Sequence, residues 1–375
     1  MSINALTYLD HNATTPMKPA VRDIYLETLD FSGNASAIHK AGREARRRIE
    51  ESRQKIASAL HTGARDVIVF TGGATEANNL ALKGAGMERV IASAIEHPSV
   101  LEVDVEKEIL PVDANGIVDV AALDKMLENN TRQTLVSVML ANNETGVIQP
   151  VEEIVAIARK RGALVHTDAV QAFGKIPLDV QKLGADFYTL SAHKMGGPQG
   201  VGCLVIANCV PVTAQTKGGN QEKNMRAGTE NLAGIVAFGA AAEQADAKTF
   251  QALAVLRDKI EAAITVAAPM VQIFGKNAPR LANTSMFSLA GASSETQLIA
   301  LDLAGICVSN GSACSSGTVK PSHVLKAMGA SDAAATSSLR VSLGWNTTER
   351  DVDFFIEQWL KMYHRIQSRA GGLHA

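Results

Sequence analysis

The chain has 375 residues, of which 46% are hydrophobic and 20% charged, and its formal net charge is -2. This length allows two domains around a large buried core. The near-neutral charge gives no reason to expect a nucleic acid or a membrane as a partner, and no apolar run reaches the length of a membrane span. Because residues 1–6 lack the regions of a signal peptide, we expect a cytoplasmic protein.

Strands and helices alternate along the first two-thirds of the chain. An extended arm is expected over residues 6–16, and helices are expected over about 38–60, from 75, after Pro98 and over 151–162. The expected strands cover residues 67–70, 90–93, 134–140, 163–167, 186–190 and 203–206. This alternation predicts a parallel sheet covered on both faces, with ligands beyond the carboxyl ends of its strands.

After about residue 255 the pattern restarts on a smaller scale. Strands are expected over 284–290, 306–309 and 339–343, and helices over 294–303 and 352–366. We therefore predict an α/β protein with two domains. The larger domain covers residues 15–255, and residues 1–14 and 256–375 form a smaller α+β domain.

Four cysteines stand at positions 203, 209, 307 and 314. They make no Cys-x-x-Cys pair, so neither a zinc site nor a disulfide framework is expected. We predict that Cys203 and Cys209, in or beside an apolar strand, are buried packing residues. Cys314 differs, because its neighbours over 309–317 are small or polar. We expect an exposed thiol on a mobile loop there, a candidate nucleophile if a cationic site is near, with an incidental surface cysteine as the alternative.

Lys194 stands between an apolar strand and a run of glycines that begins at residue 196. The glycines let a flat group approach the backbone, and Ser191 and His193 offer an oxygen and a ring nitrogen for a phosphate. A lysine in this setting can form a Schiff base with a carbonyl when enough of it is unprotonated. Taken alone, a lysine in such a turn is more often simply exposed, so the surrounding motifs decide between the two interpretations.

Other expected strand ends carry polar residues too. Ala74 and Thr75 begin a helix after a strand and two glycines, where free backbone N–H groups bind phosphate. Asp168 can hold a ring nitrogen protonated, Gln171 can reach the same ligand, and His97 can lie over an aromatic ring. Each has a structural alternative: a steric turn, a helix cap or a satisfied histidine. Together with the lysine, they are the parts that a pyridoxal phosphate site requires.

Arg340 alternates out of phase with its apolar neighbours, so it projects from the opposite face of its strand. Its guanidinium could hold a substrate carboxylate through two hydrogen bonds. A solvated surface arginine is the alternative.

The motifs together resemble those of the NifS/IscS cysteine desulfurases, in the class V aminotransferase branch of the fold-type I pyridoxal phosphate enzymes. The resemblance runs nearly end to end. It is carried by LDHNATTP (9–16), GGATEANN (72–79), ANNETG (141–146), HTDAVQ (166–171), SAHK (191–194), RAGTEN (226–231), GSACSSG (311–317) and LRVSLG (339–344).

The resemblance implies a fold-type I enzyme with pyridoxal 5'-phosphate as cofactor. It implies removal of sulfur from L-cysteine to give L-alanine and a persulfide on Cys314, for iron–sulfur cluster or other sulfur-containing biomolecule synthesis. A homodimer and a sulfur-acceptor or scaffold protein as partner are implied as well. No resident metal is expected, although the Cys314 persulfide could touch an iron–sulfur cluster.

The resemblance also assigns roles to single residues. Lys194 would bind the cofactor covalently and act as a catalytic base, and His97 would stack on the ring. The remaining assignments are Ala74, Thr75, Ser191 and His193 for the phosphate, Thr229 for the phosphate in the partner subunit, Asp168 for the ring nitrogen, Gln171 for the ring hydroxyl, and Asn143 and Arg340 for the substrate carboxylate, with Asn143 also beside the cofactor.

Two stretches depart from the family pattern. Asn-Ala-Ser over 34–36 replaces Asn-Pro-Ser, and residues 218–224 replace a more glycine-rich stretch ending in Arg-Gly. The identity of the sulfur acceptor therefore stays open. The rival hypotheses are a selenocysteine lyase or another, aminotransferase-like enzyme of this fold, and a non-catalytic sulfur-transfer scaffold.

Overall fold

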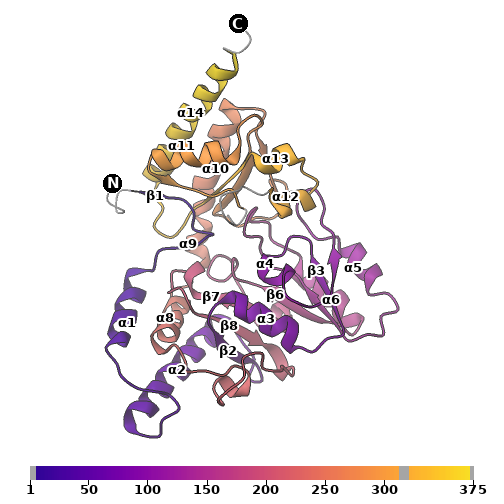
Figure 1. The fold of residues 1–375 in the computed structure, drawn as a ribbon, viewed down its shortest axis with the longest axis vertical. Coiled ribbons are helices and arrows are strands. Elements are labelled where there is room, and N and C mark those ends of the chain that lie inside the picture. Colours follow the sequence, from indigo (N-terminus) through magenta and orange to yellow (C-terminus); the bar gives the residue numbers. More distant parts are fainter. Residues whose placement is uncertain (1–5, 312–320, 372–375) are drawn as a thin grey trace.

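A computed structural model describes residues 6–311 and 321–371 of the chain. Figure 1 shows a larger part that holds most of the strands and a smaller part from which helix α14 (Glu349–Gly371) extends. Cys314 and the loop expected around it lie outside the described ranges, so the exposed thiol stays a prediction.

The larger part is built on one seven-stranded sheet. β8 pairs antiparallel with both of its neighbours, and the other neighbouring strands are parallel. This is the large, mostly parallel sheet that the alternation of strands and helices predicts. In order across the sheet, the strands are β2 (Val67–Thr71), β8 (Gly202–Ile206), β7 (Phe187–Ser191), β6 (Leu164–Asp168), β5 (Thr134–Ser137), β3 (Arg89–Ser93) and β4 (Lys107–Leu110).

Helices cover both faces of this sheet, because successive strand residues point to opposite sides. Ile68 and Phe70 of β2 belong to one apolar cluster and Val69 to another. The first cluster includes residues of α1 (Pro19–Leu29), α2 (Lys40–Ala59), α5 (Val120–Met126), α6 (Val151–Lys160), α7 (Val180–Leu183) and α8 (Leu232–Glu243). The second includes residues of α3 (Ala74–Gly84) and α4 (Pro98–Leu101).

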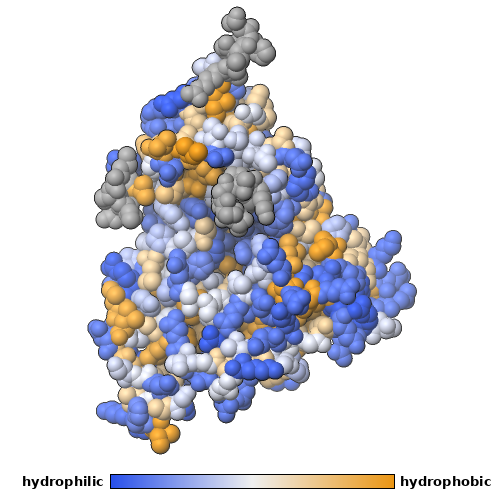
Figure 2. Space-filling view, viewed as in Figure 1, coloured by the Kyte–Doolittle hydropathy of each residue, from blue (hydrophilic) through white to orange (hydrophobic). Residues whose placement is uncertain are grey.

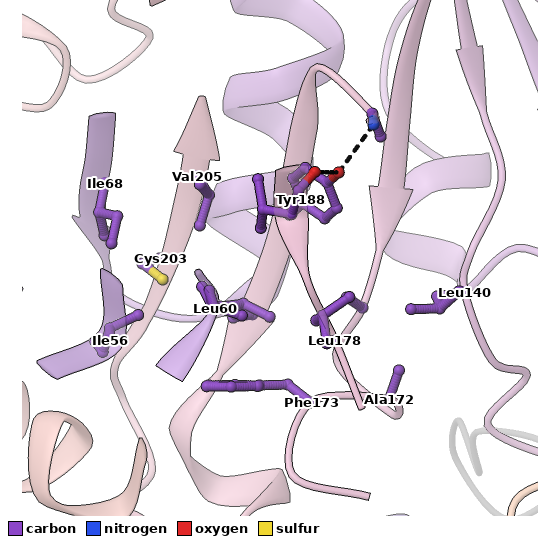
Figure 3. Close-up of a cluster of buried hydrophobic side chains, with 14 of the residues drawn as sticks. Ile56, Leu60, Ile68, Leu140, Ala172, Phe173, Leu178, Tyr188, Cys203 and Val205 are labelled. Carbon is purple, nitrogen blue, oxygen red and sulfur yellow. Dashed lines mark hydrogen bonds between the residues drawn. The ribbon is translucent and has the colours of Figure 1, made fainter. Parts of the chain in front are cut away.

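Figure 3 shows part of the first cluster, where Ile56 and Leu60 from the end of α2 lie beside the strands. Tyr188 of β7 is fully buried among them. Its hydroxyl donates to the Val180 carbonyl oxygen at 2.9 Å and accepts from the Ala185 amide at 2.8 Å. The phenol therefore fills the core and still satisfies its polar end.

The smaller part has its own antiparallel sheet and its own core, which contains Leu9 and Trp359. β1 (Thr7–Tyr8) pairs in parallel with β11 (Ile306–Cys307), so the opening arm belongs to this part. The domain boundaries at residues 14–15 and 255–256 stay predictions. The remaining elements of the smaller part are β9 (Gln272–Ile273), β10 (Thr284–Ser288), β12 (Ser338–Ser342), α10 (Leu253–Ala267), α11 (Ser294–Leu303), α12 (His323–Ala327) and α13 (Asp332–Thr336). The short helix α9 (Ala247–Gln251) precedes α10 in the chain.

Two sequence predictions differ from the structure. The strand expected over 134–140 ends at Ser137. Its pairing with β3 stops there, because the backbone amide of Met139 donates to the Glu96 carboxylate at 2.7 Å instead. Cys203 is fully buried, as predicted, but the prediction for Cys209 is wrong. Its backbone is left-handed, with a φ of 56°, and this turn leaves the thiol exposed at the end of β8.

The surface in Figure 2 is largely hydrophilic, with an apolar patch over α11. Ile299 and Leu303 of that helix are exposed. Within residues 6–311 and 321–371, no helix combines the length and the apolar character needed to cross a membrane.

Candidate active site

A large cavity of about 1460 Å³ lies at the carboxyl ends of the parallel strands. β6 ends at Asp168 and β7 ends at Ser191, and both residues line the cavity. Most of the site residues expected from the sequence meet here. They are Ala74, Thr75, His97, Asn143, Asp168, Gln171, Ser191, His193, Lys194 and Arg340.

Lys194 closes a short 3-10 turn directly after β7. Gly196 takes a positive φ of 90°, which reverses the chain after the lysine. The Lys194 amine donates to the carbonyl oxygens of Asn12 at 2.6 Å and Ala13 at 2.7 Å. Burial, and then the charge of Arg340, lowers the pKa of this amine to about 8. A substantial fraction is therefore neutral near physiological pH, as a nucleophilic lysine requires.

Asp168 is held in one orientation by two donors. Its Oδ2 accepts from the Asn78 side chain of α3 at 2.9 Å, and its Oδ1 accepts from the Val170 amide at 3.0 Å. The residue is only 6% exposed. A carboxylate fixed in this way at a strand end can pair with a cationic ring nitrogen in the cavity.

His97 forms the N-cap of α4, and Pro98 follows it at the first helical position. Its Nδ1 accepts from the Ser99 amide at 3.1 Å. Burial lowers the pKa of the ring, so it is neutral and carries its proton on Nε2. The histidine thus has a capping role as well as a position in the cavity wall.

The N-terminus of α3 faces Ser191 and His193 across the adjacent turn. A Cβ added at Gly202 would lie 2.8 Å from the carbonyl carbon of Gly73 and 3.0 Å from the amide nitrogen of Ala74. Glycine at 202 therefore allows this close approach. The free amides of the first turn of α3 can bind an anion, and burial lowers the pKa of His193 to about 4, so its ring is neutral.

Arg340 of β12 reaches the cavity from the smaller part, and its side chain is 5% exposed. Its Nη2 donates to Asp10 Oδ1 at 2.6 Å, and its Nη1 donates to the Asn143 carbonyl oxygen at 3.0 Å. Arg340 Nε and Asn143 Oδ1 are buried and have no partner in the described part of the chain. A ligand carboxylate would have to compete with Asp10 for this guanidinium, which the sequence reasoning did not foresee.

Two of the expected site residues are not placed in the cavity. Thr229 is exposed and lies outside the cavity lining. Cys314 falls in the stretch 312–320, beyond the described residues. Gly311 and Pro321, the described residues on either side of that stretch, both line the cavity.

The sequence reasoning missed the central position of Asn12. Its carbonyl oxygen accepts from Lys194 and from Gln171 Nε2, the latter at 2.9 Å. Its side chain bonds Thr284 at 2.9 Å and Asn283 at 3.0 Å, both in the smaller part. The motif over residues 9–16 could have indicated this position. An Asp-His-Asn run is unusually polar for a segment that packs between two parts, so its side chains need hydrogen-bond partners there.

Comparisons with known proteins agree with this arrangement. The family model described as aminotransferase class-V matches residues 7–355. The cysteine desulfurase IscS of Dictyoglomus turgidum is 41% identical, over 96% of this chain and 95% of that protein. An IscS-like cysteine desulfurase of Mycobacterium tuberculosis is 40% identical, over 94% and 95% respectively.

Solved structures are similar over nearly the whole chain. A NifS-like protein from Rickettsia africae matches with a TM-score of 0.90 and 36% identity, over 96% of this chain and 99% of that one. SspA in complex with cysteine matches with a TM-score of 0.77 and 29% identity, over 90% and 98%. The fold-type I architecture implied by the sequence motifs is confirmed. The chain belongs to the class-V aminotransferase family.

Proposed function

We propose that this protein is a pyridoxal phosphate-dependent cysteine desulfurase, which converts L-cysteine to L-alanine and leaves the sulfur as a persulfide on Cys314. The observation that carries the proposal is the convergence of Lys194, Asp168 and Arg340 on one cavity. Relatives named cysteine desulfurase, which match most of the chain at about 40% identity, support it.

The residues of the cavity fit the cofactor. The lysine that would hold its aldehyde carbon is half-buried and has a lowered pKa. Asp168 would hold the proton on the ring nitrogen, and the amides of Ala74 and Thr75, with Ser191 and His193, would bind the phosphate. Because residue 202 is a glycine, the start of α3 can lie close to the end of β7. The residues proposed to bind the phosphate therefore come from two neighbouring strand ends.

When bound, pyridoxal phosphate withdraws electrons from the carbon that carries the substrate's amino group. The chain's own residues then bind, orient and move protons. Lys194 is the base that can remove the proton from the substrate Cα and return it, since its neutral amine lies in the cavity wall. Asp168 would pair with the ring nitrogen, and the Asn78 side chain and the Val170 amide hold its two oxygens in place for that contact.

Arg340 and Asn143 would bind the substrate carboxylate. The buried Nε–H of Arg340 is a donor that the described residues leave without a partner. Asn143 would reach the carboxylate through its Nδ2 group, because its Oδ1 can only accept. Arg340 is already oriented by Asp10, so its guanidinium loses little conformational freedom when a carboxylate arrives.

Sulfur transfer would use Cys314. Its thiolate attacks the substrate sulfur, an S–S bond forms, and the bond between that sulfur and the substrate Cβ breaks. The electron pair of the broken bond would take up the proton that the Cys314 thiol gave up, and this new C–H bond at Cβ gives alanine. Gly311 and Pro321, the described residues on either side of 312–320, both line the cavity, which supports this role for Cys314.

A homodimer is part of the proposal. Thr229 is exposed and outside the cavity of its own chain, as expected of a residue that binds the phosphate in a partner subunit. The persulfide would then pass to an acceptor or scaffold protein, for iron–sulfur cluster or other sulfur-containing biomolecule synthesis.

The proposal is tested with the pyridoxal phosphate-loaded protein and L-cysteine, following alanine and protein persulfide by mass spectrometry. We expect equal amounts of both in a single turnover, with the added sulfur on Cys314. Cys314→Ser should keep the cofactor's colour and form no persulfide, whereas Cys209→Ser, which removes another exposed thiol, should behave like the native protein. Undiminished desulfuration by Cys314→Ser would contradict the assigned role.

A further inference from the structure

Lys175 is a buried lysine with no carboxylate partner among the described residues. It is 3% exposed, and its amine bonds only to amide oxygens: Gln171 Oε1 at 2.6 Å and Asn12 Oδ1 at 3.0 Å. The amine also lies 5.7 Å from the ring centroid of Phe250. Burying a lysine is costly, so a position like this one calls for a physical reason.

Two contacts fix the orientation of the Gln171 side chain, and Lys175 makes one of them. A side-chain amide presents oxygen at one end and nitrogen at the other, and its neighbours decide which way it points. The Lys175 amine donates to Oε1, so Nε2 lies on the other side and donates to the Asn12 carbonyl oxygen at 2.9 Å. Gln171 also lines the large cavity, and its Nε2 keeps a second N–H that the described residues leave free.

Asn12 strengthens this arrangement. Its Oδ1 accepts from Lys175 because its Nδ2 is already committed to the Asn143 carbonyl oxygen at 3.1 Å and to Thr284 Oγ1 at 2.9 Å. The Lys175 amine therefore couples the orientation of the Asn12 side-chain amide to that of the Gln171 side-chain amide.

We propose that Lys175 is a positioning residue that orients the Gln171 amide, so that Gln171 presents an N–H, rather than a carbonyl oxygen, to the ring hydroxyl of pyridoxal phosphate. This inference rests on the proposed function. An N–H facing that oxygen stabilises its ionised form, whereas a carbonyl oxygen would repel it. Burial, and then the charges of Lys194 and Arg340, lowers the pKa of Lys175 well below its usual range. The Lys175 amine donates to an amide oxygen in each of its two hydrogen bonds.

The test compares Lys175→Met with Lys18→Met as a matched control. Both lysines line a second cavity, of about 370 Å³, but Lys18 donates to the Gln244 carbonyl oxygen and bonds neither Gln171 nor Asn12. Pyridoxal phosphate is titrated into each cofactor-free protein, and the pH midpoint of the bound cofactor's visible band is then measured.

We expect Lys175→Met to weaken cofactor binding about tenfold and to raise the pH midpoint by about one unit, because one oriented hydrogen bond to an ionised oxygen is lost. Lys18→Met should change neither. In a Gln171→Ala background, Lys175→Met should add nothing, because its effect passes through Gln171.

Lys175→Arg covers the case in which the methionine variant does not fold. Arginine also carries only donors, and the second cavity leaves room for its larger head. It should keep the native midpoint. A midpoint unchanged in Lys175→Met, or additive effects with Gln171→Ala, would overturn the inference while leaving the proposed function standing. A protein that binds no pyridoxal phosphate would contradict both.

Discussion

The amine of Lys194 donates a 2.6 Å hydrogen bond to the backbone oxygen of Asn12, a residue 182 positions earlier in the chain. Asn12 in turn bonds Thr284 and Asn283 of the smaller part. The Lys194 amine is therefore held by the N-terminal arm, at the point where Asn12 also bonds the smaller part. Any movement of the arm would change the position of the amine.

The lowered pKa of Lys194 predicts unusual reactivity in the cofactor-free protein. An amine with a pKa of about 8 is half neutral at that pH, whereas an ordinary lysine needs a pH of about 10.4. Reductive methylation of Lys194, followed by peptide mass spectrometry, should therefore reach half its maximal rate near pH 8. Lys361, which is exposed, serves as the control. If the methylation rates of Lys194 and Lys361 depended on pH in the same way, the lowered pKa of Lys194 would be contradicted.

Arg340→Met should move that midpoint upward, because the charge of Arg340 lowers the pKa of Lys194. In the loaded enzyme the same change should raise the KM for L-cysteine by about tenfold to a hundredfold, the loss expected for a charge-assisted hydrogen bond. The melting temperature is measured alongside, because Arg340 also holds Asp10. A KM within twofold of native would exclude Arg340 as the carboxylate ligand.

Asp168→Asn tests the carboxylate at the end of β6. The amide keeps the shape but loses the charge that would hold a ring nitrogen protonated, so we expect kcat to fall by at least about a hundredfold, corresponding to roughly 3 kcal/mol. Asp186→Asn is the matched control, since Asp186 lies just before β7, away from the carboxyl ends, and bonds the Val165 amide. Equal losses in the two variants would indicate a structural effect only.

A stability prediction concerns the stretch 218–224 that departs from the family pattern. Glu222 has a positive φ of 44° and is buried against Arg53, with Nη1 to Oε2 at 2.8 Å, and it accepts from the Phe70 amide of β2 at 2.8 Å. Glu222→Ala leaves Arg53 partly uncompensated, so we expect a loss of about 3 kcal/mol in the free energy of unfolding. Chemical denaturation measures it.

Glu357→Ala is the control for that measurement, because its pair with Lys361 is exposed and should contribute less than about 1 kcal/mol. A loss no larger than that of the control would show that the buried pair does not anchor the stretch.

The repeating strands, and the placement of Asp168 and Lys194 at their ends, could be predicted from the sequence. Both follow from local patterns: buried parallel strands are apolar throughout, and the residue after such a strand lies at the ligand edge. The same reasoning failed for Cys209. Its apolar neighbours predict a buried side chain, but the left-handed backbone beyond β8 leaves the thiol exposed.

The contacts that complete the site could not be predicted, because they join residues far apart in the chain. Asp10 and Arg340 are separated by 330 positions, and the pairing depends on how the arm folds onto the smaller part. Nothing in the sequence marks Lys175 as a buried residue, since lysine is among the residues least often buried. Only the three-dimensional arrangement shows its amine between two amide oxygens.

The role of Lys194 is tested most directly by trapping the cofactor on the protein. Pyridoxal phosphate is added to the cofactor-free chain, the bound group is fixed by borohydride reduction, and the labelled residue is identified by peptide mass spectrometry. We predict stoichiometric label on Lys194. Label on Lys175, which is buried and also bonds Asn12, or label spread over exposed lysines would contradict the account.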